Sequence, residues 1–316
     1  PDVRAAFTVY DAFNPRSSTV PVARAGGVTS VVSAPSGGLV SGWSLWADLL
    51  GGPQSDAVVR PALALHVSLG GGARSRGVAF DALRTLLDEA ELLKTKRQAW
   101  LDGRLRPLVS RHRDVEAALP VLGGRAPVVA HVDRAADIEA LLRLADRYGL
   151  RLILDGGAEA WLLAETLAAR KIAVIVDPLR YGPSGFDDLQ VPADLAARLH
   201  AAGVPVLFAT HGAHAVRKLR QLAGNAVREG LPHAAALEAL TAAPAAAFGL
   251  TGYGRLEPGA VANVVLWDGD PLALDVAPVA VYLRGQAVSL TTRQTLLLER
   301  YRTLPGSPAP PLPLPQ

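Results

Sequence analysis

Five side chains that can bind a metal ion or move a proton follow apolar, β-branched runs of the sequence. They are His131, Asp133, Asp155, His211 and His214. If these runs are parallel strands, their carboxyl ends share one edge of the sheet, so the five side chains are expected to lie together. Three nitrogen or oxygen ligands and a water are enough for a catalytic zinc site. The five side chains could therefore form a divalent-metal centre, with zinc as the expected ion, or lie together without binding a metal.

Each of these residues also has an ordinary structural interpretation. His131 could simply be packed or hydrogen-bonded in place, and Asp133 could be a substitute oxygen ligand or a solvated loop charge. Asp155 could bind a metal ion or cap a strand–helix turn. The glycines that follow it, Gly156 and Gly157, could form an anion-binding nest. Spacing alone leaves these alternatives open.

Three further residues are candidates for substrate contact. Arg180 and Tyr181 follow the apolar run at 172–177 and could contact an anionic substrate. Trp43 lies in a Gly-rich segment, where it could line a pocket or pack under a loop. The other histidines have no partner nearby in the sequence and are expected to be structural or exposed; they are His66, His112, His200 and His233.

Short apolar runs alternate with longer stretches of helical period, such as 137–149 with its terminal Gly. This alternation is typical of βα units with a parallel sheet covered on both faces. A closed barrel has eight strands, so we expect one more strand within 80–125 and another before Pro1. The six recognised runs lie at 27–33, 62–68, 127–132, 150–155, 172–177 and 204–210.

The most specific pattern is a tandem near the end of the chain. An Ala-rich helical segment at 225–250 is followed by a segment at 254–271 with a short strand-like run. This tandem resembles the closing segment of the amidohydrolase superfamily, in the manner of imidazolonepropionase-like members. The resemblance covers nearly the whole chain, because less specific motifs elsewhere resemble segments of the same family and follow one another in the family's order. They lie at 11–15, 25–30, 34–42, 126–138, 156–161 and 291–295.

The resemblance implies an α/β fold: a (β/α)8 TIM-barrel-like domain, incomplete here, with a small C-terminal β element. The implied division is a barrel at 1–250, a small β-sandwich element at 251–290, and a terminal helix with a Pro-rich tail at 291–316. The chain does not begin with Met, so we expect that an N-terminal part carrying the family's first strand and its His-x-His pair is missing.

The resemblance also implies a chemistry. Members of this family hydrolyse carbon–nitrogen bonds other than peptide bonds with metal-activated water, and a cyclic amide or a dipeptide-like molecule is the expected substrate. His131 matches a metal-ligand position and His211 falls near the position of the family's catalytic Asp. The implied metal ligands are then His131 and His211, with Asp155 or Asp133 as an oxygen partner. His214 is an auxiliary acid/base residue, and His211 could also act as a base.

Several departures from the family pattern predict a degenerate metal site. Asp155 stands where the wider family has a His, and the His211-Gly212 pair stands where it has an Asp. Relatives also read Ala-Asp where this chain has Ala262-Asn263. The alternative to a hydrolase is therefore a catalytically inactive amidohydrolase-fold protein that binds a ligand without a metal.

The composition restricts the other function classes. Hydrophobic residues make up 50% and charged residues 19%, which is typical of a globular protein. The net charge of +3 comes without a basic run, so nucleic acid is not expected as a partner. There is no cysteine and no long apolar segment, so thiolate chemistry and a membrane span are not expected. We expect a small-molecule substrate and consider a homo-oligomer, while a cytoplasmic and a periplasmic or secreted location both stay open.

Overall fold

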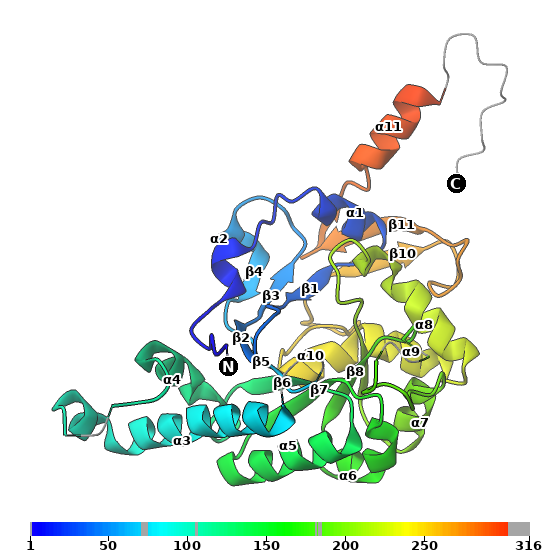
Figure 1. Ribbon diagram of the computed structural model, residues 1–316. Coiled ribbons are helices and arrows are strands. Elements are labelled where there is room, and N and C mark those ends of the chain that lie inside the picture. Colours follow the sequence, from blue (N-terminus) through cyan, green and yellow to red (C-terminus); the bar gives the residue numbers. More distant parts are fainter. Residues whose placement is uncertain (1, 71–74, 105–106, 181, 183–184, 303–316) are drawn as a thin grey trace.

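The computed structural model describes residues 2–70, 75–104, 107–180, 182 and 185–302. Its centre is a six-stranded sheet surrounded by helices (Figure 1). β2 pairs antiparallel with β5, and every following pair is parallel. In spatial order the strands are β2 (Val40–Trp43), β5 (Leu65–Ser68), β6 (Pro127–Val132), β7 (Arg151–Gly156), β8 (Ala173–Val176) and β9 (Val206–Phe208).

A mixed α/β fold with a central, mainly parallel sheet is thus confirmed. Five of the six predicted runs form β5 to β9 of this sheet. Among the described residues β2 and β9 are its two ends, so closure into a complete barrel stays a prediction. The helices that follow the strands are α5 (Ala135–Tyr148), α6 (Ala164–Ala169), α7 (Leu195–Ala201), α8 (Leu219–Arg228), α9 (His233–Leu240) and α10 (Ala242–Phe248).

The helix α5 shows why these segments fold as the sequence predicts. Its buried residues Ile138, Leu141, Leu142 and Ala145 recur at helical spacing and form one apolar stripe. The helix ends at Gly149, which adopts φ +64° in the left-handed region that glycine tolerates best. The stripe belongs to the main core, together with residues of β6 and β7.

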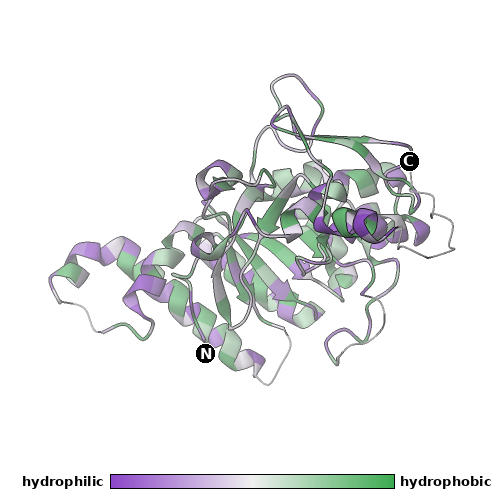
Figure 2. Ribbon diagram, turned by 90° about the horizontal axis from the view of Figure 1, so that it is seen from above, coloured by the Kyte–Doolittle hydropathy of each residue, from purple (hydrophilic) through white to green (hydrophobic). Residues whose placement is uncertain are grey.

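The two faces of the central sheet bury different residues. Val128, Ala130 and Leu152 point into the main core, between the sheet and the surrounding helices. Val129 and Ile153 point to the opposite face, into a smaller core that also holds residues of α10. Apolar side chains on both faces explain the continuous apolar runs of the sequence. Viewed from above, the strands are mostly hydrophobic and polar residues lie on the outer sides of the helices (Figure 2).

Two small antiparallel sheets lie on one side of this core. One contains β1 (Ser30–Ser33), β3 (Leu45–Asp48) and β4 (Val58–Arg60), in that order. The other contains β10 (Val264–Trp267), β11 (Pro278–Leu283) and β12 (Gln286–Val288). The predicted barrel strand at 27–33 was therefore placed wrongly, because Ser30–Ser33 pairs antiparallel with β3 in a separate sheet. Partial exposure of all four β1 residues agrees with an element outside the central sheet.

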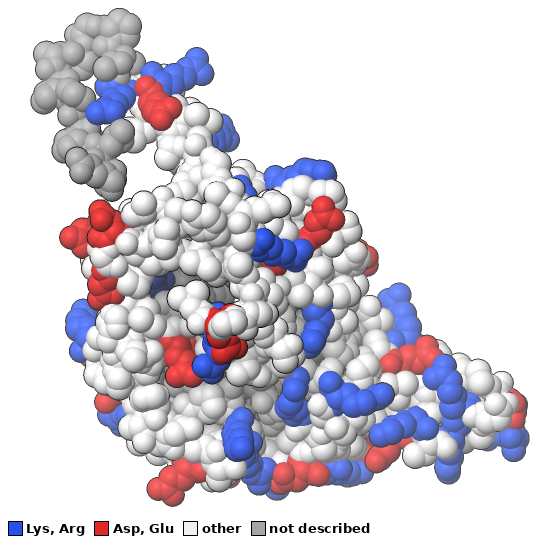
Figure 3. All heavy atoms as spheres, turned by 180° about the vertical axis from the view of Figure 1, so that it is seen from behind, with Lys and Arg blue, Asp and Glu red and all other residues white. Residues whose placement is uncertain are grey.

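The strand expected within 80–125 is also wrong for the part of this segment that is described. The described residues of this segment form α3 (Arg76–Leu101), α4 (His112–Ala118) and a short 3-10 turn at Leu119–Val121. Its Ala, Leu, Glu, Lys and Arg residues are strong helix formers, and this local preference prevails. The outer part of α3 and α4 form an arm that extends from the body (Figure 1). Many Lys and Arg side chains lie over this arm in the view from behind (Figure 3).

The remaining elements are short or peripheral. α1 (Thr19–Ala25) lies beside the small C-terminal sheet, and α2 (Gln54–Ala57) precedes β4. α11 (Arg293–Tyr301) is the expected terminal helix; it begins with a capping box formed by Thr292 and Thr295, and none of its residues is buried. The predicted Pro-rich tail lies outside the described residues. No described helix combines the length and apolarity that crossing a membrane requires.

Candidate active site

A carboxylate between two imidazoles forms the centre of the candidate site. Asp155 lies near the end of β7, directly beside His131 of β6 in the strand register. His131 Nδ1 lies 3.4 Å from Asp155 Oδ2, and His211 Nε2 lies 2.7 Å from Asp155 Oδ1. The structure therefore brings together these three of the five residues predicted from their places after the apolar runs, and Asp133 lies next to His131.

His211 reaches this position through an unusual backbone conformation. It follows β9 by three residues and adopts φ +50°, in the left-handed region that side chains other than glycine rarely occupy. Its imidazole is 48% exposed, whereas Asp155 is only 17% exposed. Strained residues of this kind are concentrated at functional sites. The ring of His211 is thus held on a buried carboxylate while one side stays open to solvent.

The charges of the three groups stabilise one another. Burial alone would raise the pKa of Asp155, but hydrogen bonds from His131 and His211 reverse this effect and hold it well below its usual value. The same hydrogen bonds raise the pKa of both imidazoles, partly opposed by desolvation. Asp177, directly after β8, further raises the pKa of His211. The site thus favours imidazolium next to carboxylate.

Both carboxylate oxygens of Asp133 accept hydrogen bonds from an arginine, Arg180. It is 3% exposed, and Arg180 donates to both of its oxygens, from Nη1 at 3.1 Å and from Nη2 at 2.8 Å. The backbone N–H of Ala158 donates to it as well, at 3.2 Å. Arg180 Nη2 also contacts Asp188, which is 1% exposed. Asp133 is therefore neither the solvated loop charge nor a free metal ligand, although its Oδ2 lies 3.9 Å from His131 Nε2.

Gly156 permits this close arrangement. A Cβ at this position would lie 2.6 Å from Asp133 Oδ1 and 3.3 Å from His131 Cε1, and its φ of +91° already suits glycine. The loop after β7 is held against the loop after β6 by backbone hydrogen bonds from Gly157 to Val132 and from Glu159 to Asp133. The close approach of Gly156 thus places Asp133 and His131 next to each other.

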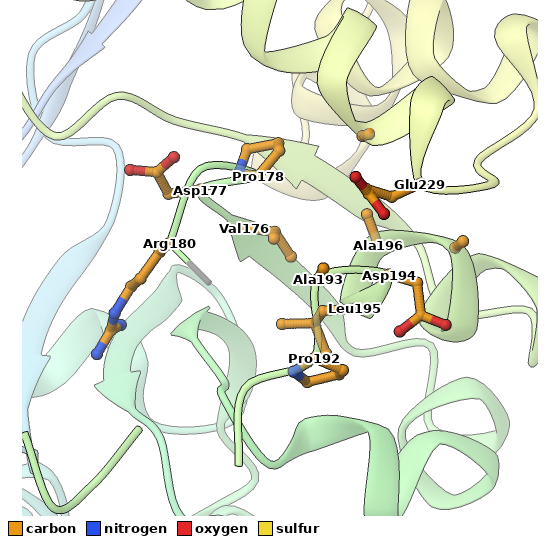
Figure 4. A pocket seen from close by; sticks show the side chains of 12 residues that line it. Val176, Asp177, Pro178, Arg180, Pro192, Ala193, Asp194, Leu195, Ala196 and Glu229 are labelled. Atoms are coloured by element: carbon orange, nitrogen blue, oxygen red, sulfur yellow. The ribbon is translucent and has the colours of Figure 1, made fainter. Parts of the chain in front are cut away.

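The other predicted residues lie elsewhere or have different surroundings. His214 is exposed and forms no ion pair with a described residue. Trp43 is 6% exposed and packs in the main core, in agreement with the packing alternative. Tyr181 lies outside the described residues. Arg180 borders a cavity of about 10 Å³, with Asp177 near it and with Asp194 and Glu229 on the opposite side (Figure 4). This cavity holds about one water, so it is too small for a substrate.

Two residues near the cluster were missed from the sequence. His66 of β5 was expected to be structural or exposed; burial lowers its pKa to about 4, and Asp155 opposes this shift. Its Nε2 is buried and has no hydrogen-bond partner among the described residues. The second missed residue is Asp177, which acts on His211. In the sequence, His66 and Asp177 are distinguished only by their position in or directly after apolar runs, and this position is too common to identify a functional residue.

The cluster does not fit a metal ion in its present arrangement. Both oxygens of Asp155 face imidazoles, and both oxygens of Asp133 are bound by Arg180. In the described part of the chain no group of three or more His, Cys, Asp or Glu side chains is arranged to hold an ion. The residue types match zinc, but their present hydrogen bonds compete with coordination.

The pH dependence of stability should report on this cluster. The raised pKa values of His131 and His211 stabilise the folded state below their usual value of 6.5, and this contribution is lost as the pH rises through the raised values. The lowered pKa of Asp155 stabilises it above 3.8, and this contribution is lost as the pH falls through the lowered value. Urea unfolding should therefore show the largest difference between wild type and Asp155→Ala between about pH 4 and 6.5. A difference that is constant from pH 3 to 9 would contradict the coupling.

The chain is similar to known amidohydrolases. The Amidohydrolase family model matches residues 213–289. The amidohydrolase tasK of Hapsidospora irregularis is 25% identical over 231 residues, which are 67% of this chain but only 23% of that protein. The crystal structure of an amidohydrolase from Thermotoga maritima MSB8 superposes with a TM-score of 0.83 at 26% identity, over 92% of this chain and 79% of that one. These three likenesses support membership of the amidohydrolase superfamily.

Proposed function

We propose that the chain is a hydrolase that cleaves a carbon–nitrogen bond of a small molecule, a cyclic amide or a dipeptide-like compound, at the His131–Asp155–His211 cluster. The observation that carries this proposal is the contact of one mostly buried carboxylate near the end of β7 with two imidazoles, one near the end of β6 and one after β9. Membership in the amidohydrolase superfamily supports the reaction class.

The roles follow from exposure and hydrogen bonding. His211 is the more exposed imidazole, and in its neutral form, which is populated as the pH rises above its raised pKa, it would take the proton from the attacking water. Asp155 would hold that ring in place and stabilise the imidazolium that forms, as carboxylates do in His–Asp pairs. His131, between Asp155 and Asp133, would donate a proton to the departing nitrogen. Arg180 would position Asp133 rather than bind substrate, since buried carboxylates already engage both of its terminal nitrogens.

A panel of hydantoins, N-acyl amino acids and dipeptides tests the proposal through release of a carboxylate and an amine. His211→Gln should lower kcat/KM by about 10²–10⁴-fold, the usual contribution of general acid–base catalysis. His200→Gln is the matched control, because His200 is an exposed imidazole on α7 away from the cluster. If wild type turns over nothing but is stabilised thermally by panel compounds, the inactive binding protein is the correct alternative.

The expected divalent ion can be tested separately. If the donors keep their present hydrogen bonds, carefully purified protein should carry less than about 0.1 equivalent of zinc, and added zinc should not raise the melting temperature. Elemental analysis of wild type and His131→Ala checks this. One equivalent of zinc that is lost in His131→Ala would instead show that His131, His211 and Asp155 rearrange around an ion, which would supply a bound water of lowered pKa.

A further inference from the structure

A second cavity, separate from the candidate active site, opens between α1, α8 and the base of α11. Its volume is about 470 Å³, within the range of roughly 300–1,000 Å³ typical of small-molecule sites. Val22 and Ala25 of α1 line it together with Ala277 and Pro278. None of its lining residues belongs to the His131–Asp155–His211 cluster. These walls can bury the apolar part of a ligand.

The charged residues that line the cavity are all cationic. They are Arg217, Lys218 and Arg220, and no Asp or Glu is among the lining residues. Arg217 and Lys218 are exposed, and neither forms an ion pair with a described residue. Uncompensated cations beside an apolar wall complement a ligand with a negative group at one end.

Arg220 differs from the other two because it fixes the shape of the cavity. Its guanidinium donates to the backbone carbonyls of Pro271, Ala273 and Val276, and it lies 5.3 Å from the centre of the Trp267 ring. It thereby ties α8 to the segment before β11. Arg217 and Lys218 are left to bind an anion.

The backbone of α1 and the start of α11 complete the site. Gly26 lies so close to Arg217 that a Cβ there would be 2.9 Å from Arg217 Cβ, so the end of α1 sits directly against the cationic segment. The hydroxyl-bearing Thr292 and Thr295 line the cavity at the first turn of α11. Their hydrogen bonds to each other hold this turn in place, and the exposed side-chain amide of Gln294 on the same turn can donate to a carboxylate or phosphate.

We propose that this cavity binds a small amphipathic anion, with its carboxylate or phosphate group at Arg217 and Lys218 and its apolar body against Val22, Ala25 and Pro278. The proposal does not depend on hydrolysis at the other site. The two sites share the loop between β9 and α8, which carries His211 at its start and Arg217 and Lys218 at its end.

Titration of the full chain with four probes tests this site: octanoate, phenyl phosphate, 1-octanol and inorganic phosphate, followed by calorimetry. Octanoate and phenyl phosphate should bind saturably, and octanol and inorganic phosphate at least about fivefold more weakly, because each lacks one of the two recognition elements. A preference between octanoate and phenyl phosphate assigns the anionic group. Equal binding of octanol and octanoate would overturn the proposal.

Variants locate the binding. Lys218→Gln combined with Arg217→Gln should weaken octanoate binding by about tenfold or more. Ala25→Phe should weaken binding of all probes by filling the apolar side. Lys94→Gln, which removes an exposed cation on α3, should leave binding unchanged. Should Ala25→Phe fail to fold, the Arg217/Lys218 variant decides alone; unchanged affinity in that variant refutes the site.

Discussion

Replacement of Asp155 by Asn is expected to reduce hydrolysis by about 10²–10⁴-fold. An Asn side chain has one oxygen acceptor, whereas Asp155 faces two imidazoles with two oxygens. One ring therefore loses its acceptor and faces an amide N–H₂ group instead. The lost negative charge should also lower the pKa of both His131 and His211, because Asp155 raises both.

Two measurements check this result. The first is kcat/KM on a panel substrate, and the second is titration of the two imidazoles by NMR. Asp146→Asn serves as the control, since Asp146 forms an exposed ion pair with Arg170 far along α5. Full activity of Asp155→Asn, with both imidazoles titrating as in wild type, would remove Asp155 from the proposed mechanism.

The second large effect is a loss of folding stability, expected when the surroundings of a buried carboxylate, Asp48, are changed. This carboxylate connects the two small sheets through hydrogen bonds. Asp48 of β3 is fully buried. Ser30 and Asn263 donate to its Oδ1, at 2.8 and 2.9 Å, and Arg284 donates to its Oδ2 at 2.7 Å. Tyr253 donates to Oδ2 as well, and burial together with Asp48 raises the pKa of Tyr253 to about 12.

Asn263→Asp should destabilise the fold by about 3 kcal/mol, because it leaves two carboxylates facing each other in a buried site. Asn263 donates its amide to Asp48 and accepts the backbone N–H of Arg284 at 2.8 Å, and only the second of these bonds survives in Asp. Urea unfolding at pH 7 measures the loss. The same experiment near pH 4 should show a smaller loss, since protonation of one carboxyl group removes the repulsion.

Asn14→Asp is the matched control, because Asn14 is exposed and its side-chain oxygen accepts only a local backbone N–H. It should change the free energy of unfolding by no more than about 0.5 kcal/mol. An Asn263→Asp protein as stable as wild type would show that the two sheets tolerate a second charge at this junction. The structure thus gives a local reason for Asn at this position: the residue at 263 must donate to Asp48.

Much of the central sheet could be predicted from the sequence, because β6 to β8 are continuous apolar runs buried on both faces. Ser30–Ser33 has the same composition but lies in another sheet, since strand composition does not specify a pairing partner. The strand expected within 80–125 depends on the eight-strand count of a closed barrel, whereas the helix propensity of the residues in α3 and α4 prevails there.

In the candidate site, too, some features could be predicted from the sequence and others could not. His131, Asp155 and His211 could be grouped because parallel strands present their carboxyl ends on one edge. The partners of Asp133 could not be predicted, because Arg180 reaches it across the loop after β8. His66 and Asp177 carried no distinctive spacing. Trp43 looked like a pocket residue, but its strand pairs with β5 and buries it.

The sequence by itself indicated the resemblance to amidohydrolases, the order of β5 to β9 and the grouping of His131, Asp155 and His211. These depend on local periodicity and on residue types along the chain. Only the tertiary structure decided which oxygens and nitrogens face one another: Asp155 between two imidazoles, Asp133 against Arg180, and Asp48 against Asn263. The physical reason is that such contacts depend on strand register and loop paths, which bring together residues many positions apart and which no local pattern encodes.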